Sequence, residues 1–216
     1  MSPLLFVALC ALSVAGLLVA EHRQSQRLKW LFKPAASLFF ILVAIAAGTA
    51  SKTGMTPFGL AILAGLVLCA LGDVLLIPKA AGTFLAGMAA FAAGHAAYIA
   101  AFFIGGVVIG PVAIGGLAAT AAAGALLVAA LWRELGSFRV PVIGYCAIIS
   151  VMVAASLGHW RAAPDDASAA LALAAIGFAA SDISVARDRF GGAGYFNRAW
   201  GLPLYFAAQC LFALNV

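Results

Sequence analysis

Long apolar runs dominate this sequence, and their length decides what the chain can fold into. Eight of them are separated by short polar connections, and we place them at 3–20, 31–50, 57–77, 83–104, 107–131, 140–158, 168–186 and 199–215. A helix needs about 20 mostly apolar residues to span a bilayer, and continuous rather than alternating runs favour helices over barrel strands. Only 9% of the residues are charged, against about 25% in ordinary soluble domains. The sequence predicts an all-α polytopic membrane protein with eight transmembrane helices in a single transmembrane domain, 1–216.

The basic residues are distributed unevenly among the connections. The first, third, fifth and seventh connections hold ten Lys and Arg residues, whereas the even-numbered ones hold Lys52 and Arg161. By the positive-inside rule this bias places the odd connections in the cytoplasm and both termini outside. The same bias explains the net charge of +5. Binding to nucleic acid is not expected, because the sequence has no basic patch interleaved with aromatic residues. We therefore expect a protein integral to the cell (inner) membrane, with the bilayer as its partner and no nucleic acid; the sequence indicates no oligomeric state.

The cysteines and the first apolar run have simple interpretations. All four cysteines lie inside apolar runs without CxxC spacing, which argues against disulfides and against a metal site. No Lys or Arg precedes the first run, whereas a secretory signal peptide has a basic region there. We interpret that run as a retained first helix.

Two acidic residues lie within predicted spans, where charge is costly. Five of the seven acids fall in connections, but Asp73 lies near the end of the third span and Asp182 near the end of the seventh. A carboxylate at the centre of a membrane costs about 2.5–3.5 kcal/mol on insertion scales and usually faces a cavity or a partner. At about 1.5 Å per residue, the two lie roughly 7–9 Å below Lys79 and Arg187, which is deep for a simply solvated acid. Both spans run from outside to inside, so we interpret the two acids as functional groups at similar depth on the cytoplasmic side.

Other polar residues gather in the same half of the predicted membrane domain. Each alone is typical of a packing or anchoring residue, but together they outline a polar cavity that opens toward the cytoplasmic side. The candidates for binding a substrate are Lys33, His95, Tyr98, Tyr145, Ser181, Tyr205 and Gln209, and those for a headgroup rim are Arg187 and Arg198.

The two halves of the chain share a weak similarity. Gly72-Asp73 and Ser181-Asp182 each end a span, and the following span contains Phe-Ala-Ala, at 91–93 and at 206–208. Four spans separate the two copies, which predicts a 4+4 parallel repeat with an axis along the membrane normal. Such an axis would bring the two aspartates face to face.

Taken in order, these residues resemble the lysoplasmalogenase (YhhN-type) membrane family. The resemblance covers nearly the whole chain in short pieces. They are Lys33-Pro34, Gly72-Asp73-Val74-Leu75-Leu76, Phe84-Leu85-Ala86-Gly87-Met88, Phe91 with Gly94-His95 and Tyr98, Tyr145 with Met152, Ser181-Asp182, and Tyr205 with Gln209.

The resemblance implies an eight-helix membrane hydrolase with Asp73 and Asp182 as its motif acids. The implied reaction is hydrolysis of the vinyl ether bond of lysoplasmalogens to a fatty aldehyde and a glycerophospho-alcohol, with a lysophospholipid and water as partners. A vinyl ether is cleaved by protonation on carbon, which two carboxyl groups in different protonation states can support, as in glycosidases. The sequence does not distinguish their roles; we take Asp182 as the acid and Asp73 as the carboxylate. This chemistry requires no metal and no cofactor.

Two other classes of function remain open at this stage. Buried acids with a histidine also occur in proton-coupled carriers, and internal repeats are common there. A haem-binding protein needs two axial ligands at matching depth, but His22 and His159 flank helices and leave only His95.

Overall fold

The computed structural model describes residues 2–51, 54–78, 80–192 and 194–216, so Lys52 and Lys79 lie outside the described residues. Within these ranges the chain is helical and contains no strand, which confirms the all-α prediction. In chain order the elements are α1 (Pro3–His22), α2 (Gln26–Ala50), α3 (Pro57–Leu75), α4 (Ala81–Gly105), α5 (Pro111–Ala130), the short α6 (Trp132–Leu135), the 3₁₀ helix η1 (Gly136–Phe138), α7 (Arg139–Ala162), α8 (Asp166–Phe190) and α9 (Tyr195–Leu214).

Most of the long helices have the length and composition of membrane spans. Among the described residues seven segments qualify, namely α1 to α5, α8 and the stretch Trp132–Ala162 that includes α7. The eighth long helix, α9, has 20 residues but carries Asn197, Arg198 and Gln209 among its apolar residues. The predicted set of membrane helices is therefore present as seven to eight helices. The orientation of the termini and the parallel repeat stay predictions.

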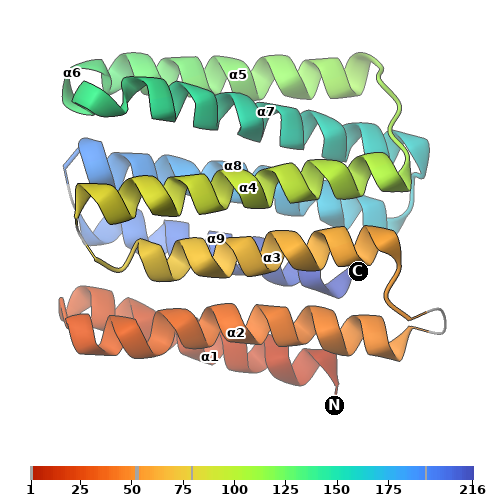
Figure 1. Cartoon of the computed structure of the whole chain (residues 1–216), viewed down its shortest axis with the longest axis horizontal. Coiled ribbons are helices and arrows are strands. Elements are labelled where there is room, and N and C mark those ends of the chain that lie inside the picture. The colour runs from red at the N-terminus through yellow and green to blue at the C-terminus, as the bar shows by residue number, and fades with distance from the viewer. Residues whose placement is uncertain (1, 52–53, 79, 193) are drawn as a thin grey trace.

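The long helices lie side by side and alternate in direction along the chain (Figure 1). The pair α1 and α2 forms one edge of the bundle, the pair α5 and α7 forms the other, and α9 packs against α1, α2, α3 and α8. The last turns of α1, α3, α5 and α8 lie together at one end of the bundle, which we call the basic end (Figure 1). Both chain ends point toward the opposite end (Figure 1).

Prolines and polar caps explain where several helices begin. Pro57 and Pro111 occupy the first turns of α3 and α5, where a missing N–H is not needed. At the start of α8, the Asp165 carboxylate accepts a hydrogen bond from the Ser168 backbone N–H, and the Ser168 hydroxyl lies against the Asp165 backbone N–H. These bonds hold the pKa of Asp165 below its ordinary value.

The helix boundaries differ from the predicted spans where polar residues extend a helix. α2 begins at Gln26 rather than 31, with Ser25 as its cap, and α8 continues to Phe190 rather than 186. The predicted span 107–131 begins only at Pro111, because Gly106 adopts a φ of 93° and ends α4. The charged ends of a membrane helix can stay helical beyond the lipid, so the apolar runs of α2 and α8 underestimate these helices, whereas the run of α5 overestimates its helix.

Small residues bring α3 and α4 into close contact. A Cβ atom at Gly72 would lie 2.7 Å from the Phe91 ring, and one at Gly94 would lie 2.7 Å from the Cys69 sulfur. Small residues allow this approach between membrane helices. Because Gly72 directly precedes Asp73, the close contact also fixes the position of the first acid.

Candidate active site

A cavity of about 540 Å³ lies in the half of the bundle toward the basic end. Both acids of the sequence analysis, Asp73 on α3 and Asp182 on α8, are among the residues that line it. The predicted site residues found in its wall are Lys33, Asp73, Tyr145, Ser181, Asp182, Arg198 and Tyr205. The fold thus brings residues from five helices that are distant in sequence to one cavity.

Asp73 lies among one cation and two hydroxyl groups. Its Oδ1 atom is 3.2 Å from the Lys33 ammonium of α2, and its side chain is only 2% exposed. Its Oδ2 atom accepts hydrogen bonds of 2.7 Å from the Tyr205 hydroxyl of α9 and from the Ser37 hydroxyl of α2. Both carboxylate oxygens are therefore held by donors from two different helices.

Asp182 has a different environment. Its Oδ2 atom accepts a 3.1 Å hydrogen bond from the Tyr145 hydroxyl and lies 3.5 Å from His95 Nε2. His95 Nε2 also lies 3.2 Å from the Tyr145 oxygen, and its Nδ1 lies 3.1 Å from the Met152 sulfur. With a side chain that is 14% exposed, Asp182 faces the cavity more openly than Asp73 does.

Aromatic rings connect the surroundings of the two acids. The Phe178 ring lies 5.3 Å from the ring of Tyr205, the partner of Asp73. It also lies 4.4 Å from the imidazole of His95, the partner of Asp182. The two carboxyl groups therefore have separate polar partners that share one apolar wall.

Three of the predicted substrate-binding residues do not line the cavity among the described residues. His95, Tyr98 and Gln209 are fully buried and are not among the described residues that line the cavity. The Tyr98 hydroxyl donates a 2.6 Å hydrogen bond to Gln209 Oε1, while Gln209 Nε2 has no hydrogen-bond partner among the described residues. Ser181 is among the residues that line the cavity, but its hydroxyl donates to the Phe178 carbonyl of its own helix.

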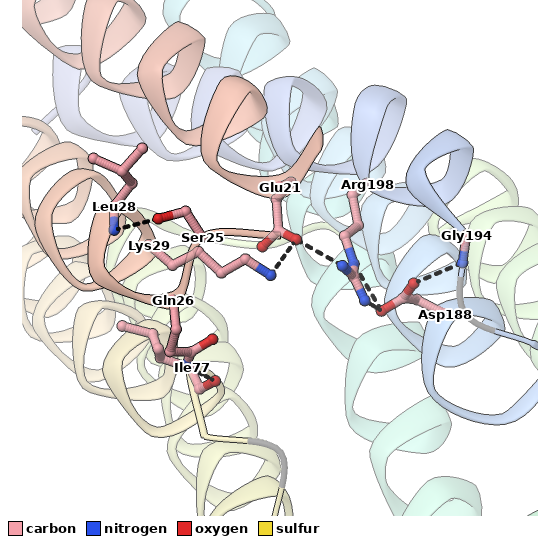
Figure 2. Close-up of polar contacts among 9 residues, drawn as sticks. All are labelled: Glu21, Ser25, Gln26, Leu28, Lys29, Ile77, Asp188, Gly194 and Arg198. Carbon is pink, nitrogen blue, oxygen red and sulfur yellow. Dashed lines mark hydrogen bonds and ion pairs between the residues drawn. The ribbon is translucent and has the colours of Figure 1, made fainter. Parts of the chain in front are cut away.

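Four charged side chains form a connected set of ion pairs at the basic end of the cavity (Figure 2). Glu21 Oε2 lies 2.6 Å from Lys29 Nζ and 2.7 Å from Arg198 Nη1. Arg198 Nη2 lies 2.9 Å from Asp188 Oδ2, and the Gly194 N–H donates to Asp188 Oδ1. We call Glu21, Lys29, Asp188 and Arg198 the rim network; it joins α1, α2, α8 and α9.

Only one member of the rim network was predicted from the sequence. Arg198 was expected there, but Glu21, Lys29 and Asp188 were assigned to connections, although they lie within α1, α2 and α8. Arg187 is exposed on α8 and is not among the described residues that line the cavity. Ser37 was also missed, and its position four residues after Lys33 on one helix is a signal that they share a face.

Fold and site together define a polytopic helical membrane protein with two carboxyl groups in one cavity. A family model described as the YhhN family matches residues 28–216, and the chain belongs to this family. This confirms the resemblance that the sequence motifs indicated.

Two curated relatives have similar sequences over most of their length. Lysoplasmalogenase TMEM86A of Bos taurus is 34% identical over 191 residues, which cover 86% of this chain and 72% of the relative. Lysoplasmalogenase TMEM86A of Homo sapiens is 31% identical over 190 residues, with the same coverage of 86% and 72%. The comparison with solved structures gave no significant match.

Proposed function

We propose that this protein hydrolyses the vinyl ether bond of lysoplasmalogens and releases a fatty aldehyde and a glycerophospho-alcohol. The observation that carries the proposal is that Asp73 and Asp182 line one cavity. Membership of the YhhN family and the two relatives named lysoplasmalogenase support the choice of substrate.

The reaction needs an acid, a negative charge and a water molecule at one place. A vinyl ether resists nucleophiles, but protonation of its β carbon gives an oxocarbenium ion that water captures as a hemiacetal. The hemiacetal then collapses to aldehyde and alcohol, so one water is consumed. The proton that the water loses goes to the carboxyl pair, which ends the cycle in its starting state. Two carboxyl groups in different protonation states meet these needs, as in glycosidases that pass through a similar cation.

Asp73 is the better candidate for the carboxylate. The Lys33 ammonium and the hydroxyls of Ser37 and Tyr205 all stabilise its ionised form, because each donates to a carboxylate oxygen. In this role Asp73 stabilises the oxocarbenium ion and orients the attacking water.

Asp182 is the better candidate for the acid. Its contacts, the Tyr145 hydroxyl and the His95 imidazole, bring no permanent positive charge beside it. It also faces the cavity, as a group must when it transfers a proton directly to a substrate carbon. Tyr145 and His95 hold the carboxyl group in position.

The basic end of the cavity is the proposed site of the headgroup. The rim network places Arg198 and Lys29 at the cavity wall, where a phosphate can replace an acidic partner of the guanidinium group. Arg187 lies further out on α8 and contributes through its charge. In the cell (inner) membrane this end faces the cytoplasm, as the distribution of basic residues predicts.

Purified protein assayed on a lysoplasmalogen beside an ester lysophospholipid tests the proposal. Release of aldehyde from the first and no fatty acid from the second is the expected result. Fatty acid alone would identify a lysophospholipase. If neither aldehyde nor fatty acid were released, the result would contradict the hydrolase and favour the proton-coupled carrier. The contact between His95 and Asp182 also suits the proton relay of such a carrier.

A further inference from the structure

The cavity extends beyond the two acids toward the side of the bundle. Its charged end is the rim network, and its other arm runs between α5 and α8. The residues of the two helices that line this arm include Thr120, Ala123 and Leu127 on α5 and Ile176, Ala179 and Ala180 on α8; α7, which packs against both helices, also lines the cavity. Among these six side chains only Thr120 is polar, and its hydroxyl donates to the Gly116 carbonyl of its own helix. The cavity is therefore charged at one end and apolar at the other.

The helices that border the apolar arm do not close it. α5 packs along α7 at the edge of the bundle, and the described residues show no extended packing of α5 against α8. Ala123 on one wall is exposed, and Ile176 on the other is 43% exposed. Residues that line the cavity are thus also reached from outside the bundle, which makes the arm a lateral opening.

The opening lies at membrane depth, close to the acids. Thr120 is ten residues before the end of α5 at the basic end, and Asp182 is eight residues before the end of α8. At about 1.5 Å per residue these positions lie roughly 15 Å and 12 Å from the helix ends. A bilayer has a hydrocarbon core of about 30 Å, which the 20 mostly apolar residues of α5 just span, so Thr120 near the middle of this helix lies at the depth of the acyl chains.

We propose that the gap between α5 and α8 is a lateral portal that holds the hydrocarbon chain of a single-chain lipid while the chain's far end stays in the bilayer. The occupant follows from the cavity itself, since one end has paired charges and the other is apolar and open to lipid. The inference rests on the proposed function for the identity of the lipid. The volume of about 540 Å³ suits the reacting part of one lipid molecule.

A bulky residue at the portal tests this inference with little risk to folding, because the position is exposed. Ala123→Trp narrows the arm, and Ala122→Trp is the matched control, because Ala122 is also exposed and is not among the residues that line the cavity. For a long-chain lysoplasmalogen we expect kcat/KM to fall about tenfold or more in Ala123→Trp and to stay within about twofold of the unsubstituted protein in the control. For a short-chain substrate, the fall in kcat/KM in Ala123→Trp should be much smaller.

A binding measurement separates failure of the portal from failure of the proposed reaction. The probe is a saturated 1-O-alkyl-glycerophosphocholine, which has the headgroup and chain but no vinyl ether bond. Binding about tenfold weaker in Ala123→Trp than in Ala122→Trp supports the portal, whether or not aldehyde is released. Equal binding in the two variants, or no binding to the unsubstituted protein, overturns it. Binding without aldehyde release contradicts the hydrolase alone.

Discussion

The Lys33 ammonium lies 3.2 Å from Asp73 Oδ1 on the neighbouring helix. The sequence predicts Lys33, near the start of its span, as a residue that binds the substrate. The structure gives it a nearer partner, the carboxyl group that we propose to face the oxocarbenium ion. A residue that holds only a headgroup affects KM, whereas one that maintains the charge of a catalytic carboxylate affects kcat.

Lys33→Ala should therefore lower kcat by about tenfold to a hundredfold, with a smaller change in KM. Steady-state kinetics on a lysoplasmalogen give both constants. Arg27→Ala is the matched control, since Arg27 is exposed on the same helix. A raised KM at unchanged kcat would return Lys33 to the role of a substrate-binding residue.

Asp73→Asn and Asp182→Asn should each reduce aldehyde release by about 10²- to 10⁴-fold while the protein still inserts and folds. Each replacement keeps the size of the side chain but removes the carboxyl group that the mechanism needs. Asp166→Asn is the control, because Asp166 is an exposed acid in the first turn of α8, the helix that carries Asp182. Near-normal turnover in either cavity variant would disprove the paired-carboxyl mechanism.

Loss of the hydroxyl should affect turnover at one buried tyrosine and stability at the other. Tyr205→Phe removes a donor to Asp73, so kcat should fall about tenfold or more; the loss of stability should be the smaller effect, because Ser37 still donates to the same oxygen. Tyr98→Phe leaves Gln209 Oε1 without its donor, so it should cost about 1–3 kcal/mol of stability and leave turnover per folded molecule unchanged. Thermal unfolding in detergent and turnover, measured on the same samples, check both expectations. If Tyr98→Phe lost turnover without losing stability, Tyr98 would belong to the reacting site.

Asp165 should make the stability of the protein depend on acid pH. Hydrogen bonds from Ser168 lower its folded pKa, so its stabilising effect is complete above the ordinary value and is lost as pH falls through the folded pKa. Unfolding temperatures from neutral pH down to about pH 3 should therefore show a gap between the protein and Asp165→Asn that closes below about pH 4. A gap of constant size over this range would mean that the carboxylate charge does not stabilise the cap.

Apolar run length and the two misplaced acids predicted much of what the structure shows. The number of long helices followed from the eight runs, and the expectation that Asp73 and Asp182 share a cavity followed from their depth. The rim network could not be found in this way, because Glu21 and Asp188 look like ordinary loop charges until α1 and α8 are seen to extend over them. The division of polar partners between the acids was also hidden, since Tyr98 and Tyr205 have similar sequence surroundings. Which tyrosine meets a carboxylate depends on the packing of α9 against α3.

The contacts of α9 set an order on the assembly of this site. Glu21 and Lys29 belong to the first helical hairpin and can pair as soon as it is inserted, whereas Arg198, the second partner of Glu21, lies 177 residues further along the chain. Tyr205, a donor to Asp73, is supplied by the same late helix. A nascent chain that stops before α9 would carry both acids in the membrane. Asp73 would then lack its hydrogen bond from Tyr205, and the cavity would lack the residues that α9 contributes to its lining. Synthesis of the C-terminal helix is thus the step that turns an inserted bundle into a finished site.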